Sequence, residues 1–140
     1  MSVVYYTIEI AWLIKPPEEV FVNETFTCAF RACYTPITNL NTQTPETRRA
    51  PPIFDSLQMR GFAELETSVP NDTLIVASIN RPDLPISEPS TIDFEFKLQS
   101  AGPGKRRIFA YVNLWFKGDN REEIGFSGTL TSDLFEVTES

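Results

Sequence analysis

Hydrophobic and polar residues alternate along most of this chain, which is the pattern of β-strands that bury one face. The alternation is clearest over residues 92–98, where every second position is apolar: Ile92, Phe94, Phe96 and Leu98. Successive side chains of a strand point to opposite faces, so this run predicts one buried face. A turn rich in glycine and proline at 100–104 separates it from a second alternating run at 108–116. The spacing therefore predicts a β-hairpin over residues 92–116.

The run at 108–116 is apolar on both faces. One face carries Ile108, Ala110, Val112, Leu114 and Phe116, and the other carries Phe109, Tyr111 and Trp115. Such a strand is typical of the centre of a sheet that is covered on each side, so we expect an opposite sheet over the three aromatic residues. The alternative is that these three side chains form a surface for a ligand or a partner.

Similar alternation predicts strands elsewhere, at about 6–14, 20–22, 26–34, 57–65, 74–79, 124–130 and 134–137. The third of these has an inward row made of Phe26, Cys28, Phe30, Ala32 and Tyr34. Between 57 and 65 two arrangements fit: an inward row of Leu57, Met59 and Gly61, or Phe62 with Leu65 after a bulge. No stretch shows helical spacing over three turns with caps.

Seven to nine short strands with turn signals between them predict an all-β protein, an immunoglobulin-like antiparallel β-sandwich. A closed barrel is the alternative. At 140 residues the chain is long enough for one domain, which we place at 1–140. Residues 35–52 hold almost no large apolar side chains and predict a long loop, either mobile or functional.

The chain is acidic, with 12 Lys and Arg against 19 Asp and Glu and a net charge of −7. This balance argues against nucleic-acid binding by the whole surface, because phosphate contacts need a basic face. A local basic patch is predicted at the two ends of the 108–116 strand, formed by Lys105, Arg106, Arg107, Lys117 and Arg121. The alternative is that these are solvated loop ends.

The sequence contains few of the residue arrangements that catalytic and metal sites use. Histidine is absent, which excludes the Ser-His-Asp and Cys-His arrangements and most catalytic zinc sites. Cys28 and Cys33 are five apart in one predicted strand, so they face opposite sides and we expect free thiols. Asp93 and Glu95 share a polar strand face without any sign of a cleft. We expect no enzyme activity, no metal and no cofactor.

The ends of the chain and its apolar runs bear on the compartment. The N-terminus lacks the basic region and the cleavage site of a signal peptide, and no apolar run approaches the ~18 residues of a membrane helix. We therefore expect an intracellular protein, in the cytoplasm or the nucleus.

Several segments, in order, resemble the velvet domain of fungal regulators. They are Arg31-Ala32-Cys33, Arg48-Arg49-Ala50-Pro51-Pro52-Ile53, Leu74 to Ser78, Ile92 to Phe96, Gly104 with Arg107-Ile108-Phe109, and Ser132 to Val137. The resemblance implies a Rel-like immunoglobulin sandwich that dimerises. It also implies a DNA contact near Arg31, Arg48 and Arg49.

Taken together, these observations predict a non-catalytic protein-interaction or dimerisation module, with a protein partner in a homo- or heterodimer. One alternative is a DNA-binding regulator that uses a local arginine patch, and another is a small-molecule or sugar-binding sandwich. The candidate interaction residues are Arg31, Arg48, Arg49, Lys105, Arg106, Arg107, Phe109, Tyr111 and Trp115.

Overall fold

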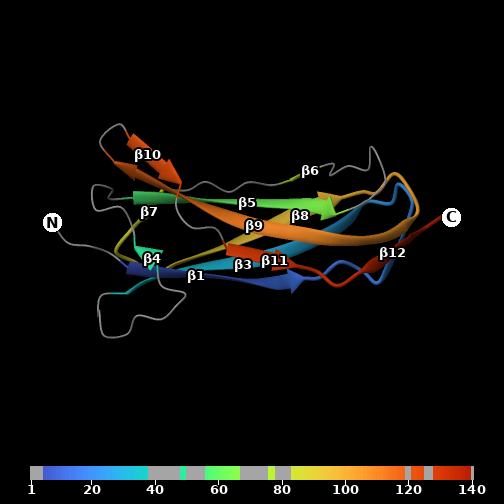
Figure 1. The fold of residues 1–140 in the computed structure, drawn as a ribbon, viewed down its shortest axis with the longest axis horizontal. Helices are drawn as coiled ribbons and strands as arrows, with labels where there is room; N and C mark the ends of the chain where they lie inside the picture. The colour runs from blue at the N-terminus through green and yellow to red at the C-terminus, as the bar shows by residue number, and fades with distance from the viewer. Residues whose placement is uncertain are drawn as a thin grey trace.

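The protein is an all-β sandwich of two packed sheets (Figure 1). The structure, a computed structural model, describes residues 5–37, 48–49, 56–66, 76–77, 83–118, 121–124 and 128–139. Twelve strands lie within these ranges, and three of them have only two residues. The remaining nine agree with the predicted seven to nine. Within the same ranges there is no helix that is long and apolar enough to cross a membrane.

The first sheet has five strands. In spatial order they are β4 (Arg48–Arg49), β1 (Tyr5–Ile14), β3 (Phe26–Ile37), β8 (Ser90–Leu98) and β6 (Val76–Ala77). All of its pairs are antiparallel.

The second sheet is organised around β9 (Gly104–Gly118), which runs the length of the molecule in Figure 1. Its order is β2 (Glu19–Phe21), β12 (Phe135–Thr138), β9, β5 (Ser56–Glu66) and β7 (Leu84–Pro85). Two further strands pair with β9: β10 (Arg121–Ile124) and β11 (Gly128–Thr131). The pair of β2 with β12 is parallel, and the others are antiparallel.

The core lies between the inner faces of the two sheets. The predicted inward row of β3 is confirmed, since all five of its side chains are buried. The Phe30 ring stacks on Phe94 and Phe96 with centroids 5.2 and 5.4 Å apart. Tyr6 meets Phe116 of the opposite sheet at 5.5 Å. Burial of such side chains is the main source of folding free energy, at about 1.5–3 kcal/mol for each large apolar residue.

The predicted β-hairpin over residues 92–116 is wrong, because β8 and β9 lie in different sheets. β8 pairs with β3 and β6, whereas β9 pairs with β5, β10, β11 and β12. The connection therefore crosses from one sheet to the other, and Ser100 within it is fully buried. The alternation correctly gave the buried face of each strand, but the two faces meet across the core and not side by side.

β5 settles the two arrangements left open between 57 and 65. Its register with β9 is continuous from Ser56 to Glu66, without a bulge. Leu57, Met59 and Ala63 are buried, and Gly61 lies on the same inner face against Phe94. The first arrangement is therefore the observed one.

The long loop begins later than predicted. β3 continues through Thr35 to Ile37, and Pro36 pairs with Tyr6 of β1. The β3–β8 ladder has already ended at Tyr34, so Pro36 lies where β3 pairs with β1 alone, a position of the kind that proline occupies in sheets. Arg48 and Arg49 then pair with β1 as β4. Residues 38–47 and 50–52 lie outside the described residues.

Candidate functional site

The outward face of β5 and β9 carries a row of aromatic side chains. The strand register places Phe62 beside Tyr111, and Phe109 lies two positions before Tyr111 on β9. The Phe62 and Tyr111 rings stack with centroids 5.0 Å apart and an interplanar angle of 17°. Phe109 packs on Tyr111 at 5.6 Å. Together with Arg60, Glu64 and Trp115, these residues form what we term the aromatic face.

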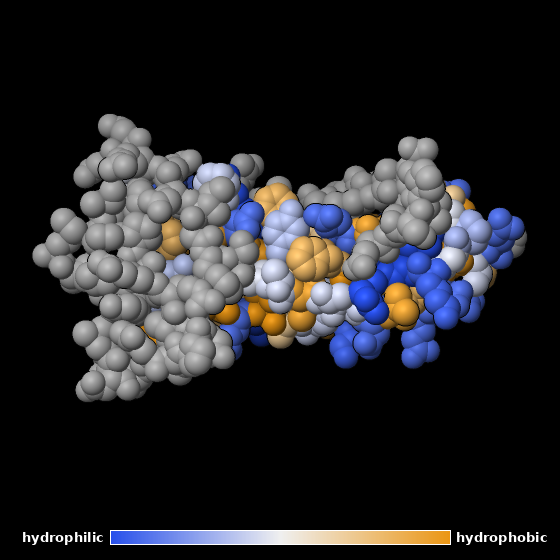
Figure 2. All heavy atoms as spheres, in the orientation of Figure 1, coloured by the Kyte–Doolittle hydropathy of each residue, from blue (hydrophilic) through white to orange (hydrophobic). Residues whose placement is uncertain are grey.

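The aromatic face is half-buried and lies on the side of its sheet that faces away from the core. Phe62, Phe109, Tyr111 and Trp115 are all of intermediate exposure, whereas their inward neighbours on β9 are fully buried. The expectation that an opposite sheet covers these side chains is wrong, because the five-stranded sheet packs against the other face of β9. Figure 2 shows orange, hydrophobic side chains in the middle of the molecule and bluer side chains toward its right-hand end.

Arg60 and Trp115 form the charged end of the aromatic face. The Arg60 guanidinium lies 4.1 Å from the centroid of the Trp115 ring, a cation–π contact. An Arg60 amino group also donates to Gln58 Oε1 at 3.0 Å. Arg60 Nε and Trp115 Nε1 are buried without an acceptor, and unmade hydrogen bonds of this kind cost stability. Packing, and not hydrogen bonding alone, therefore holds this pair.

Glu64 and Tyr111 form the opposite, acidic side of the same face. Glu64 is exposed, and its carboxylate lies near enough to the Tyr111 hydroxyl to influence its pKa. Partial burial raises the pKa of Tyr111, and the negative charge and hydrogen bond of Glu64 raise it further. The phenol therefore stays protonated and keeps its role as the donor.

Arg31 lies on the other sheet and is already ion-paired. Its guanidinium donates to both carboxylate oxygens of Asp93, at 2.8 and 3.1 Å, across the β3–β8 ladder. The hydrogen bond to Arg31 lowers the pKa of Asp93, with the positive charge adding to the effect. Arg48 and Arg49 lie on the edge strand β4, next to β1 and not to Arg31.

The predicted basic patch does not form one surface. Lys105, Arg106 and Arg107 lie at the start of β9, and Lys117 lies at its end, about 40 Å away by strand geometry. Arg106 is only 2% exposed, and its guanidinium donates to the carbonyls of Gly102, Pro103 and Lys105. It holds the crossing connection in place and is not a surface cation. Lys105 is exposed, and Arg107 is half-buried.

Both cysteines are free, and they lie on opposite faces of β3 as predicted. Cys28 is fully buried, and burial raises the pKa of its thiol to about 12. Cys33 is half-buried on the outer face, within reach of the Thr91 hydroxyl at 3.8 Å. Among the described residues, no three Cys, Asp or Glu side chains come together as a metal site would require.

Sequence reasoning missed Phe62 and Arg60 as members of the aromatic face. The signal was present, because Gln58, Arg60, Phe62 and Glu64 alternate with the inward row of β5. Whether these side chains belong to the aromatic face depends on which strand lies beside β5. The alternation of one strand contains no information on its neighbour.

No protein-family model, no curated protein and no solved structure matches this chain. A proposal for its function therefore depends on the geometry described above.

Proposed function

We propose that this chain is a non-catalytic protein-interaction module that forms a dimer through the aromatic face. The observation that carries the proposal is the half-buried row of Phe62, Phe109 and Tyr111 on the outer side of a sheet. Contiguous aromatic side chains outside a core are a frequent feature of interface centres, where large side chains lose the most contact with water.

The charges around Phe62 favour a second copy of the same chain as the partner. Arg60 and Glu64 lie two positions before and after Phe62 on the same outward face of β5. A two-fold axis across the strands at Phe62 would place Arg60 of each copy opposite Glu64 of the other. Such self-complementarity is what a two-fold interface requires.

The aromatic face gives less support to a sugar-binding role. Sugar platforms present open ring faces, but here Phe62 and Tyr111 stack on each other and Arg60 covers the face of Trp115. The DNA-binding alternative also has less support, because Arg31 is ion-paired with Asp93 and Arg106 is buried. Neither guanidinium is therefore free to bind phosphate. The velvet resemblance and its DNA contact stay predictions.

We infer further that the sandwich is immunoglobulin-like. Such domains have one sheet in the order A-B-E-D and another that contains C, F and G. The order β1-β3-β8-β6 fits the first if these are strands A, B, E and D, and β5-β9-β12 fits the second as C, F and G. Because this fold hosts many functions, it supports the proposed module without identifying its role.

Charge reversal tests the proposed dimer most sharply. Arg60→Glu and Glu64→Arg should each weaken self-association, because each places like charges opposite one another across the two-fold axis. The double variant should recover much of the loss. Sedimentation velocity at matched concentrations measures all four proteins, with Arg31→Glu on the other sheet as the control.

A wild-type dimer that none of these variants weakens would overturn the proposed interface. Tyr111→Phe separates the two roles of Glu64, because it removes the hydroxyl that Glu64 influences but keeps the ring. It should leave dimer formation nearly unchanged.

A further inference from the structure

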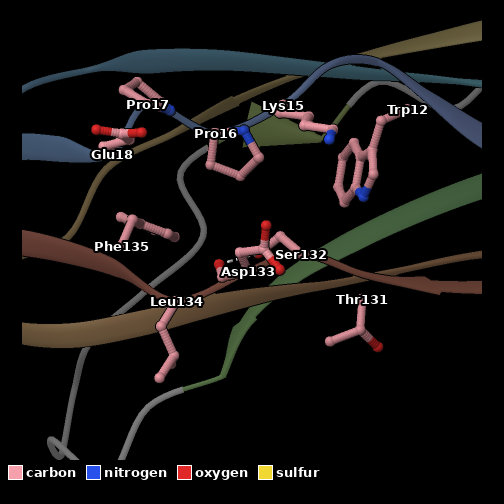
Figure 3. A pocket seen from close by; sticks show the side chains of 10 residues that line it. All are labelled: Trp12, Lys15, Pro16, Pro17, Glu18, Thr131, Ser132, Asp133, Leu134 and Phe135. Atoms are coloured by element: carbon pink, nitrogen blue, oxygen red, sulfur yellow. Dashed lines mark hydrogen bonds between the residues drawn. The ribbon is translucent and has the colours of Figure 1, made fainter.

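A cleft opens between the end of β1 and the β11–β12 connection. Its volume is about 390 Å³. One wall is Trp12 with residues 15–18, and the other is residues 131–135. In Figure 3, Trp12 and Pro16 project from the β1 side toward Ser132 and Asp133. This size lies within the range of clefts that hold a small ligand or a few side chains.

A β-bulge builds the floor of this cleft. Thr131 pairs with Phe109 and Phe135 pairs with Arg106, so four steps along one strand face three along β9. The connection between β11 and β12 therefore contains one extra residue relative to β9. Ser132 fixes the bulge, because its N–H donates to the Ile108 carbonyl at 2.9 Å and its Oγ accepts from the Ile108 N–H at 2.8 Å. Bulges of this kind recur beside binding sites, where they redirect side chains.

The cleft is lined by apolar side chains and by charged side chains that form no ion pair within the described residues. Leu134 is 54% exposed despite its apolar character. Glu18, Asp133 and Lys15 form no side-chain hydrogen bond or ion pair with any other residue in the described part of the chain. The three charges leave the cleft with one net negative charge.

Acidic neighbours make the entrance more negative. Glu19 and Glu136 are exposed and sit side by side on the parallel strands β2 and β12. Against these two carboxylates, the adjacent ladder position on β9 offers one cation, Lys105. A positively charged group is therefore the ligand that the surrounding field attracts.

We propose that the cleft binds a short segment of a partner protein in which a basic side chain lies next to an apolar one. The carboxylates of Glu18 and Asp133 attract the cation, and the Trp12 ring at the other end of the cleft also favours a positive charge (Figure 3). The apolar neighbour passes over the β11–β12 connection and covers Leu134, whose side chain points away from Trp12 and Pro16 in Figure 3. The exposed leucine makes a protein segment the better occupant than a free amine, which would leave Leu134 in water. None of the residues that line the cleft belongs to the aromatic face, so this proposal does not rest on the proposed dimer.

Peptide titration followed by NMR tests the proposal on the intact chain. The probe is the capped peptide acetyl-Leu-Arg-Arg-Leu-amide, and the matched control is acetyl-Leu-Glu-Glu-Leu-amide. We expect saturable shifts of the Trp12 indole N–H and the amides of Asp133 and Leu134 with the basic peptide alone. Glu18→Gln with Asp133→Asn should weaken binding by about fivefold, since exposed ion pairs contribute modestly to affinity. Lys15→Met should strengthen it, because it removes the competing cation.

Two results would overturn the proposal. One is the absence of Trp12 shifts with the basic peptide, or equal shifts with the acidic one. The other is binding of n-butylamine or guanidinium as tight as that of the peptide, which would make the cleft a site for a free cation. The substituted side chains are exposed and unpaired, so the variants should fold as the parent does.

Discussion

Gly61 and Phe94 meet across the core at a distance that leaves no room for a side chain at Gly61. A Cβ built on Gly61 would overlap Cδ1 of the Phe94 ring, and it would lie 2.6 and 2.8 Å from Cγ and Cε1 of the same ring. Phe94 also stacks on Phe30 within its own sheet. The ring therefore fixes the spacing of the two sheets at this point, and the glycine is required by packing and not by backbone conformation.

Gly61→Ala should destabilise the fold by about 3 kcal/mol, at the upper end of the cost of overpacking. Denaturant unfolding measures the change, and Gly128→Ala is the matched control. A Cβ at Gly128 would lie 3.3 Å from the nearest atom, Cγ2 of Ile10, so that variant should cost clearly less. Phe94→Leu should recover part of the loss in the Gly61→Ala background. Equal costs for the two glycines would contradict this account.

Ser132→Ala should cost about 1–3 kcal/mol, because it leaves the buried N–H of Ile108 without an acceptor. Hydrogen exchange at Ile108 should rise together with the loss of stability. Asp133→Ala is the control, because its side chain is exposed and its carbonyl, which accepts from the Ser132 hydroxyl, is retained. A neutral Ser132→Ala variant would show that the hydroxyl does not fix the bulge.

Arg106→Met should destabilise the protein by about 3 kcal/mol or more. The substitution keeps most of the apolar stem but leaves the carbonyls of Gly102 and Pro103 without their charged donor. Thermal unfolding measures the loss. Lys105→Met is the control next to it in sequence, since Lys105 is exposed. Similar small effects in both variants would mean that the Arg106 guanidinium does not stabilise the connection.

Stability should fall as pH rises from about 9 toward 12, in part because of Cys28. Burial raises the pKa of its thiol from 9.0 to about 12, so in this window the unfolded chain has lost a proton that the folded chain keeps. The contribution is at most about 1.4 kcal/mol per pH unit. Denaturant unfolding at several alkaline pH values should give a shallower fall for Cys28→Ala than for the parent. Identical slopes would mean that the thiol titrates normally.

The sequence predicted the strands and their buried faces, but not which strands pair. The alternation of β8 and β9 identified Phe94, Phe96, Ile108 and Val112 as core residues, and all four are buried. It did not reveal that the 100–104 turn changes sheets, because that depends on Arg106 reaching back to the turn carbonyls. The sequence pattern predicts surface charge for the three consecutive cations Lys105, Arg106 and Arg107, although the side chain of Arg106 is buried.

The candidate site was predictable in part for the same reason. Phe109, Tyr111 and Trp115 stood out as a second apolar face of one strand. Arg60 and Phe62 joined them only when the register between β5 and β9 was known. The cleft beside Trp12 could not be predicted, because it arises from a one-residue bulge whose position depends on the pairing of β11 and β12 with β9.

In the proposed function, the aromatic face joins two copies of this chain. Light scattering during size-exclusion chromatography, over a tenfold range of concentration, tests it most directly. The account predicts a mass of twice the 15.9 kDa of one chain, falling toward one chain on dilution or in a Phe62→Lys variant. A single-chain mass at every concentration, or a dimer that Phe62→Lys leaves intact, would contradict it.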